Sequence, residues 1–424
     1  MSHLLVDLST ASPVRTAAEA GAYIASVCFK HGPPRRIGIE LEWLLTDPDD
    51  PLRRPDLPTL LTALGPHAPR TLSPDSPAKP LPAGGLVSVE PGGQVEISSA
   101  PATSCAALIA AMRRDISRLG ELLQPAGFVL CDRAADPGRA GHRILHTPRY
   151  DAMAAGFARI SPAGAVMMCA TAAAQICIDL GRPEQAGQRW RAAHLLGPVL
   201  LAAFANSPAP SHASARMAAW WELDPPRTAP PASFDPADYV QRALDTAMLA
   251  RQRSAGDWLL HEPVSLREWI SAGEPLDTRD INLHLSMMFP PVRPQGYLEL
   301  RYLDAQPAGE WVAPLALVAA LFADAGTLAQ VQEACLPAAD RWLQATELGL
   351  TDPVLARAAA ELAVIGDRSV GALGLRPAEL ELVRRLLERR LGQRISPAAD
   401  AGEQPAPVAG GRPAPVAAAG GEPS

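Results

Sequence analysis

Two segments of the chain place carboxylates on one face of an expected β-strand. The first reads Arg36-Ile37-Gly38-Ile39-Glu40-Leu41-Glu42-Trp43, and the second reads Glu90-Pro91-Gly92-Gly93-Gln94-Val95-Glu96-Ile97-Ser98. Because successive side chains of a strand point to opposite faces, this alternation makes one face aliphatic and gathers acids on the other. Like charges opposed on a sheet destabilise it, so a bound cation is the simplest explanation for these acids.

The same alternation predicts strands over 36–45, 87–90, 95–98, 171–180, 282–288 and 297–302. Polar residues in the last three of these strands are Thr171, Gln175, Asp179, Asn282, His284, Ser286, Glu299 and Arg301. The pattern favours an α+β fold with a mainly antiparallel sheet. Helices are expected on the aliphatic face of this sheet, and the polar face is expected to stay open and to carry the chemistry.

Helical spacing of apolar residues predicts helices over 103–123, 190–205, 238–250, 311–335 and 378–391, the first capped by Thr103. Prolines and weak periodicity predict long surface loops over 46–83 and 206–236. The turn around Gly92 and Gly93 is interpreted as a structural hairpin, since it lacks the Lys-Ser/Thr ending of a phosphate loop.

Three regions are expected along the chain. Residues 1–34 form an N-terminal helical lead-in, and residues 35–394 form one catalytic domain. The segment 395–424 is rich in Ala, Pro and Gly, a composition that buries too little apolar surface to offset the entropy of ordering. We expect this tail to be disordered.

Composition excludes several classes of protein. A net charge of -7 without a basic stripe argues against a nucleic-acid partner. The N-terminus lacks the features of a signal peptide, and the apolar run 311–322 is too short to span a bilayer, so a cytoplasmic protein is expected. Six scattered cysteines indicate neither a zinc site nor a disulfide framework.

The candidate metal ligands are five glutamates of the expected polar face: Glu40, Glu42, Glu90, Glu96 and Glu299. A set of carboxylates without cysteine favours Mg²⁺, with Mn²⁺ as an alternative. The competing interpretation pairs each glutamate with an arginine, as Glu299 with Arg301, although one arginine cannot neutralise five acids. His284 is open between a metal ligand, a substrate contact and a structural histidine.

Taken together, these segments resemble the glutamate–cysteine ligases of the plant and proteobacterial type, and most closely their actinobacterial branch that feeds ergothioneine synthesis. The shared pieces run in the family's order: Gly38-x-Glu40-x-Glu42, Glu90-Pro-Gly-Gly-Gln-x-Glu96-x-Ser98, Pro148-Arg149-Tyr150, Thr171 with Gln175, Ala205-Asn206-Ser207-Pro208, Arg216-x-x-x-Trp220, Asp224-Pro-Pro-Arg227-Thr228, Phe289-Pro290-x-Val292-Arg293 and Tyr297-Leu298-Glu299-x-Arg301. The resemblance covers roughly residues 35–306.

The resemblance implies a glutamine-synthetase-like catalytic domain with a curved antiparallel sheet. It also implies ATP-dependent ligation of the γ-carboxylate of L-glutamate to the amine of L-cysteine, through γ-glutamyl phosphate and with Mg²⁺ on the phosphates. The implied partners are these three small molecules, while the oligomeric state is left open.

The resemblance also implies roles for single residues. Glu40, Glu42, Glu90, Glu96 and Glu299 would hold the metals, and Arg227 and Arg301 would act catalytically on the transferred phosphate. Arg149, Arg216, Gln175, Thr171 and His284 would bind substrate. The chain departs from the plant pattern at Ala170, where an arginine is expected, and at Ala172, where a cysteine is common.

There are three alternative functions, and one of them, a catalytically silent metal-binding scaffold, is disfavoured by Arg149, Arg216 and Arg227. A carboxylate–amine ligase of the same family could use a different amine, because none of the residues named above is expected to recognise the thiol of cysteine. A metal-dependent phosphohydrolase could also use an acidic site, but such sites usually mix Asp and His with the acids.

Overall fold

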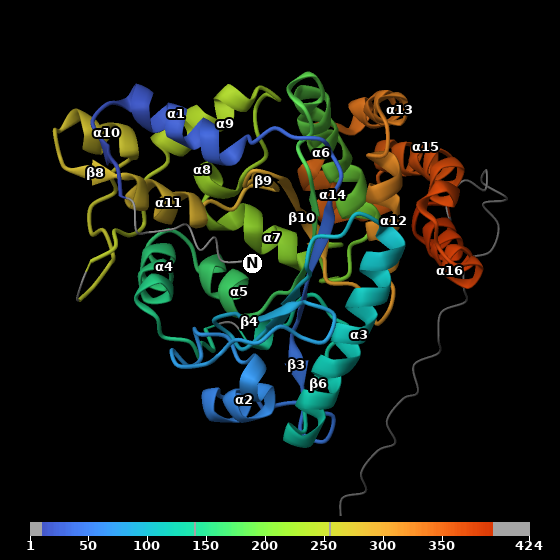
Figure 1. Ribbon diagram of the computed structural model, residues 1–424, viewed down its shortest axis with the longest axis horizontal. Coiled ribbons are helices and arrows are strands. Elements are labelled where there is room, and N and C mark those ends of the chain that lie inside the picture. The colour runs from blue at the N-terminus through green and yellow to red at the C-terminus, as the bar shows by residue number, and fades with distance from the viewer. Residues whose placement is uncertain (1–10, 140, 254–255, 393–424) are drawn as a thin grey trace, which may run out of the picture.

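The computed structural model describes residues 11–139, 141–253 and 256–392. A six-stranded sheet runs through the middle of the molecule (Figure 1). Its strands, in spatial order, are β4 (Leu86–Val89), β5 (Val95–Ser98), β2 (Ile37–Trp43), β7 (Ala173–Ile178), β10 (Leu298–Asp304) and β9 (Val292–Pro294). All neighbours are antiparallel. The predicted α+β class and antiparallel sheet are confirmed.

The register of β2 brings the polar residues of three strands together. Glu42 lies opposite Glu96 of β5, and Glu40 lies opposite Gln175 of β7. The alternate residues Ile37, Ile39 and Leu41 are buried on the other face. The period of two in the sequence therefore separates an aliphatic from a polar face, as predicted.

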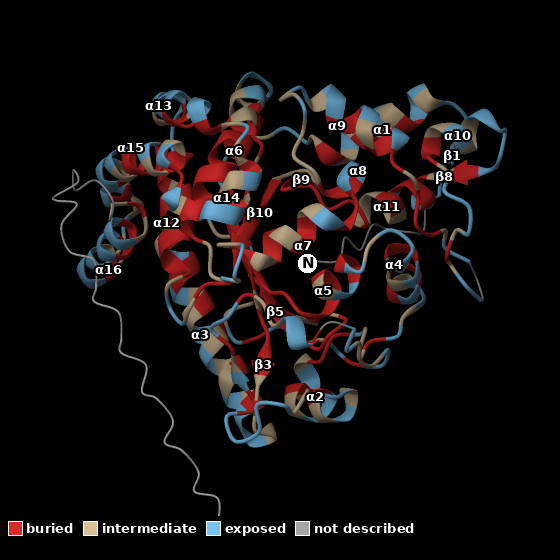
Figure 2. Ribbon diagram, turned by 180° about the vertical axis from the view of Figure 1, so that it is seen from behind, coloured by how far each residue is buried: buried red, intermediate tan, exposed pale blue. Residues whose placement is uncertain are grey.

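A thick helical layer covers the aliphatic face. Its helices are α3 (Cys105–Leu123), α6 (Pro183–Ala203), α12 (Val312–Leu321), α13 (Ala325–Cys335), α14 (Trp342–Leu348), α15 (Pro353–Val370) and α16 (Pro377–Leu387). α6 packs directly on β10, where the Tyr302 hydroxyl donates to the Ala193 carbonyl at 3.2 Å. Figure 2 shows that β10, α6 and α12 are largely buried, whereas α16 presents an exposed outer side.

A second set of helices covers the polar face, which was expected to stay open. It consists of α4 (Pro148–Ala158), α5 (Ala163–Cys169), α7 (Ala215–Leu223), α8 (Pro225–Thr228) and α11 (Thr278–Ser286). Figure 1 shows α4, α5 and α7 on the opposite side of the sheet from α12 and α15. The charged side chains of the sheet are therefore enclosed between the sheet and these helices.

The remaining elements form two groups, at the upper left and at the bottom of Figure 1. The upper group holds α1 (Ala17–Cys28), α9 (Pro236–Asp245), α10 (Leu266–Ser271) and the pair β1 (Pro13–Val14) with β8 (Leu276–Asp277). The lower group holds α2 (Leu57–Leu64) and the pair β3 (Leu45–Thr46) with β6 (Val129–Leu130). Short helical turns connect the larger elements: η1 (Gly65–His67), η2 (Gln124–Ala126), η3 (Pro137–Arg139), η4 (Leu336–Ala338), η5 (Gly349–Thr351), η6 (Gly371–Leu373) and the π-helical η7 (Glu388–Gly392).

No single helix in the described part of the chain is long and apolar enough to cross a membrane. Among the described residues, the helical segments Val312–Leu321 and Ala325–Ala338, bent by 111° against each other, reach that length and apolar composition when they are taken together.

Several predicted elements differ from the structure. Residues 282–288 were predicted as a strand, but most of them belong to the helix α11. Asp277 and Asp280 form a capping box at its start, and this local signal outweighs the apolar alternation that followed it. The predicted loop 206–236 contains α7 and α8, and the loop 46–83 contains α2. Ser104, rather than Thr103, caps α3. The tail 395–424 lies outside the described residues.

Candidate active site

A pocket lined by acids and arginines lies between the polar face of the sheet and its covering helices. Eight residues predicted for the site line this pocket: Glu42, Glu90, Glu96, Arg149, Thr171, Gln175, Arg216 and Arg301. The sheet supplies Glu42, Gln175 and Arg301, whereas Arg149 comes from α4 and Arg216 from α7. Segments far apart in sequence thus converge on one site.

The hairpin between β4 and β5 places Glu90 and Glu96. Its turn closes with bonds from Gly93 N to Glu90 O at 2.9 Å and from Glu90 N to Gln94 O at 2.8 Å. Gly93 has φ +85, and a Cβ at Gly92 would lie 2.4 Å from the Cys169 carbonyl oxygen. Both glycines are therefore required by the turn and by its close approach to α5. The structure confirms the predicted hairpin.

A chain of hydrogen bonds fixes the centre of the pocket. Gln175 Nε2 donates to Glu42 Oε1 at 2.7 Å, and Arg301 Nη1 donates to Gln175 Oε1. The second oxygen of Glu42 accepts from Ala173 N at 2.9 Å. Glu96 Oε1 accepts from the hydroxyls of Ser88 and Ser98. Both carboxylates are thus oriented by the strands around them.

Burial and the charge of Glu90 together raise the pKa of Glu42 to about 7, although Arg216 acts to lower it. A raised carboxyl pKa means that the ionised form lacks a sufficient counter-charge in this pocket. A cation bound beside Glu42 and Glu90 would remove that deficit, so the electrostatics fit the predicted metal.

Arg149 and Arg216 bring positive charge from the covering helices. Arg149 Nη2 donates to the Ser286 carbonyl at 2.9 Å. Arg216 Nη2 donates to the Arg301 carbonyl at 2.8 Å, and its Nη1 lies 3.7 Å from Asp304 Oδ1. Its guanidinium stacks over the Trp220 ring at 5.0 Å. Arg301 Nε is buried without a hydrogen-bond partner among the described residues, which leaves a donor to an incoming anion.

Glu299 lies outside this pocket and is held by two arginines. Arg293 contacts both its oxygens, at 2.7 and 2.9 Å, and Arg301 Nη1 donates to Oε1. Burial acts to raise the pKa of Glu299, but the two guanidinium charges lower it to about 2. In this structure the carboxylate pairs with both guanidinium groups, as the competing interpretation expected, and its role as a metal ligand stays a prediction.

Arg227 and His284 are held by buried hydrogen bonds outside the pocket. Arg227 is fully buried and donates to Asp224, Met287 O and Ala247 O, the last at 2.6 Å. His284 lies on α11, where Nε2 contacts the Ala243 carbonyl at 2.9 Å, and burial with the nearby Arg227 lowers its pKa to about 3. Neither side chain lines the pocket, and their catalytic and substrate-binding roles stay predictions.

Glu40 lines a neighbouring cavity of about 250 Å³ with Gly38, Cys177 and Tyr297, further along the same polar face. The sequence analysis missed Asp304, which anchors Arg216. A β-bulge between Leu300 and Leu303 interrupts the alternation there, so no regular pattern marked it.

In the part of the chain that the structure describes, no three His, Cys, Asp or Glu side chains are arranged as a ready metal site. Mg²⁺ in nucleotide-dependent enzymes commonly takes one or two carboxylates, several waters and the substrate phosphates. The oxygen donors Glu42, Glu90 and Glu96 fit that mode of binding.

Residues 36–382 match the family model described as glutamate-cysteine ligase family 2 (GCS2). This sheet and its enclosed site define a ligase-type catalytic domain, and the chain belongs to the glutamate–cysteine ligase family 2.

Curated relatives agree with that family. The glutamate–cysteine ligase EgtA of Mycobacterium tuberculosis is 35% identical over 94% of this chain and 93% of its own length, and EgtA of Mycolicibacterium smegmatis is 33% identical over 94% of each. The chloroplastic glutamate–cysteine ligase of Brassica juncea is 28% identical over 52% of this chain and 46% of that protein.

The fold also matches a solved structure. A crystal structure of glutamate–cysteine ligase from Francisella tularensis in complex with AMP gives a TM-score of 0.50 at 12% identity, covering 86% of this chain and 83% of that chain. Identity at this level supports the fold alone.

Proposed function

We propose that the protein joins the γ-carboxylate of L-glutamate to the amino group of L-cysteine, with ATP converted to ADP and phosphate. The observation that carries this proposal is the single pocket in which Glu42, Glu90 and Glu96 face Arg149 and Arg216. The carboxylates suit the metal of a metal-bound polyphosphate, and the arginines suit the carboxylates of an amino acid.

In this proposal the carboxylates and the arginines have separate tasks. Glu42, Glu90 and Glu96 hold Mg²⁺ or Mn²⁺, which when bound neutralises charge on the phosphates of ATP. Arg149 and Arg216 bind the carboxylates of glutamate through bidentate hydrogen bonds. Arg301 uses its unpartnered Nε to orient the transferred phosphoryl group.

The reaction then has two steps. A γ-carboxylate oxygen of glutamate attacks the γ-phosphorus of ATP, and ADP leaves, giving γ-glutamyl phosphate. The cysteine nitrogen attacks the acyl carbon, phosphate leaves, and the amine loses its proton. The enclosed position of the pocket excludes water that would hydrolyse the intermediate. We propose that this takes place in the cytoplasm and that γ-glutamylcysteine feeds ergothioneine biosynthesis.

The test uses purified protein with ATP, Mg²⁺, glutamate and one of several amines, and follows ADP release and the peptide product. We expect both products with cysteine and ADP formation that requires glutamate. ADP release independent of glutamate would exclude a ligase and favour a phosphohydrolase. Efficient turnover with glycine or alanine but little with cysteine would assign another amine.

A further inference from the structure

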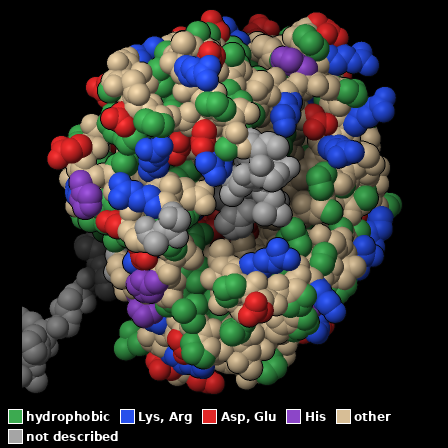
Figure 3. All heavy atoms as spheres, turned by 60° about the vertical axis from the view of Figure 1, so that its left-hand side comes forward, with side chains coloured by type: hydrophobic (Ala, Val, Ile, Leu, Met, Phe, Trp, Pro, Cys, Tyr) green, Lys and Arg blue, Asp and Glu red, His purple; other side chains and the backbone are tan. Residues whose placement is uncertain are grey.

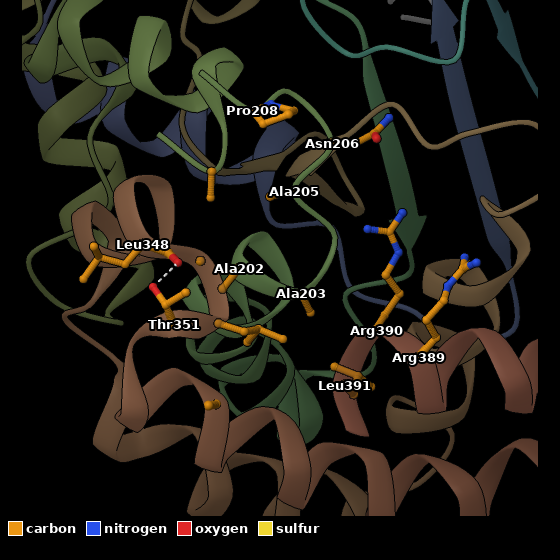
Figure 4. Close-up of a pocket in the computed structure, with 14 residues that line it drawn as sticks. Ala202, Ala203, Ala205, Asn206, Pro208, Leu348, Thr351, Arg389, Arg390 and Leu391 are labelled. Atoms are coloured by element: carbon orange, nitrogen blue, oxygen red, sulfur yellow. Dashed lines mark hydrogen bonds between the residues drawn. The ribbon is translucent and has the colours of Figure 1, made fainter. Parts of the chain in front are cut away.

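Another cavity, of about 410 Å³, lies apart from the active-site pocket and shares no lining residue with it. It lies where the end of α6 (Ala202), the segment 205–208, the end of α14, η5 and η7 meet (Figure 4). Its volume falls within the roughly 300–1,000 Å³ typical of small-molecule sites. It can therefore hold a compact metabolite.

The charge in this cavity is positive. Of the described residues that line it, the charged ones are Arg389 and Arg390. Both guanidinium groups contact the same oxygen of Glu310, Arg389 at 2.5 Å and Arg390 at 3.1 Å. One carboxylate for two arginines leaves an excess positive charge, and each guanidinium keeps further N–H donors. An anion is the ligand that this arrangement attracts.

The arginines are presented in a defined geometry. They are neighbours on the π-helical turn η7, which follows α16 directly. Figure 4 shows both side chains extending from η7, with Asn206 and Pro208 on a separate wall of the cavity. The other walls are mainly apolar, with Ala202, Leu348 and Leu391 among them. The site thus offers a cationic end and an apolar body.

One wall of the cavity is tied to the active site. Asn206 N and the Ser207 hydroxyl both donate to Asp304 Oδ2, at 2.8 and 2.7 Å. The Ser214 hydroxyl, at the start of α7, donates to Asp304 Oδ1 at 2.9 Å. Asp304 in turn pairs with Arg216. A ligand that displaces the 205–208 wall therefore acts on the arginine proposed to bind glutamate.

We propose that this cavity binds a small organic anion, a carboxylate or phosphate monoester with a compact apolar body, and that its binding changes the affinity for glutamate. The effect on glutamate rests on the proposed function, whereas binding itself does not. Coupling between sites typically changes affinity by about 5- to 150-fold.

The test measures binding of phenyl phosphate and of benzoate by calorimetry, with ADP, Mg²⁺ and glutamate present to fill the active site. We expect one probe to bind at millimolar concentration or tighter, which also identifies the preferred anion. Arg390→Gln should weaken binding at least tenfold. Because Arg389 remains to pair with Glu310, this variant leaves no carboxylate unpaired.

Two further variants sharpen the test. Arg384→Gln changes the same charge on α16, where Arg384 pairs with Asp367 away from the cavity, and should bind normally. Ala356→Leu keeps both arginines but fills the apolar part, and should also weaken binding. Equal binding by wild type and Arg390→Gln, or no binding by wild type, would overturn the site. An unchanged KM for glutamate with probe bound would overturn the coupling alone.

Discussion

Glu42 and Glu299 lie on the same polar face of the sheet, but their surroundings shift their protonation in opposite directions. Burial and Glu90 raise the pKa of Glu42 to about 7, whereas Arg293 and Arg301 outweigh burial and lower that of Glu299 to about 2. A carboxylate without a counter-charge can bind a cation, while a neutralised one stabilises the fold. We therefore expect different effects from variants of these two residues.

Glu299→Gln should destabilise the protein strongly. It leaves Arg293 and Arg301 buried without their shared counter-charge, and removing one partner of a buried ion pair costs about 3–5 kcal/mol. Urea denaturation measures this loss of unfolding free energy. Wild-type stability in this variant would contradict the structural role.

Glu42→Gln should leave the fold nearly intact but reduce kcat at least 100-fold. The amide removes an unfavourable buried charge, and this gain opposes the loss of one acceptor for the bonds from Gln175 and Ala173, which costs about 1 kcal/mol. Steady-state ADP release and urea denaturation together test both parts. Full activity would exclude Glu42 as a metal ligand.

The pH dependence of stability follows from the same carboxylate. The folded protein holds the Glu42 proton more tightly than the unfolded chain, whose pKa is near 4.5. Stability from this group is therefore complete below about pH 4.5 and is lost as the pH rises through about 7, by at most about 3 kcal/mol. Denaturation in EDTA at about pH 5 and pH 7.5 should show the loss in wild type and a smaller one in Glu42→Gln. Glu299, with its lowered pKa, stays ionised across this range.

At the scale of elements, the β4–β5 hairpin and the start of α7 determine the geometry of the pocket. The hairpin positions Glu90 and Glu96 only because its turn packs against the end of α5. The start of α7 positions Arg216 through Asp304, which accepts bonds from three donors. A disturbance of either element should alter the pocket without touching a substrate-binding group.

Gly92→Ala should lower both stability and activity. Its Cβ would lie 2.4 Å from the Cys169 carbonyl oxygen, so the turn or α5 must move. Gly187→Ala is the matched control, since no atom lies within 4 Å of its Cβ and alanine favours a helix interior. We expect a lower melting temperature and activity only for the first variant, and equal behaviour of the two would refute the close approach.

Asp304→Asn should raise the KM for glutamate roughly tenfold or more with a smaller effect on kcat. The substitution removes the carboxylate charge that lies 3.7 Å from Arg216 Nη1 and weakens the hydrogen bonds that Asp304 accepts, and hydrogen bonds to charged groups contribute about 1.5–3 kcal/mol. Ser207→Ala, which removes one bond to Asp304 but keeps the charge, should have a weaker effect. Initial-rate kinetics with glutamate varied separate the two, and a lowered kcat at constant KM would contradict a positioning role.

At the scale of the whole molecule, the sequence predicted the strands of the sheet better than the helices that cover its polar face. Alternation of period two marked β2, β5, β7 and β10 because each has one aliphatic and one polar face. It failed at α11, where Leu283 and Leu285 alternate within a helix set by its cap. Many pocket residues were predicted, whereas the pairing of Glu299 and the anchoring by Asp304 depend on contacts that no local pattern records.

Basic and acidic side chains are interspersed on the molecular surface that Figure 3 shows.

The strand order also has a consequence for synthesis of the protein. β2 (Ile37–Trp43) pairs with β7 (Ala173–Ile178), and β7 pairs with β10 (Leu298–Asp304), so the centre of the sheet joins three distant parts of the chain. During synthesis, the edge of β7 therefore stays unpaired until Asp304 has left the ribosome. Until then, Glu42 also lacks the nearby charge of Arg301. An unpaired edge invites association with other chains. We expect stalled or truncated chains that end before β10 to depend on chaperones or to aggregate.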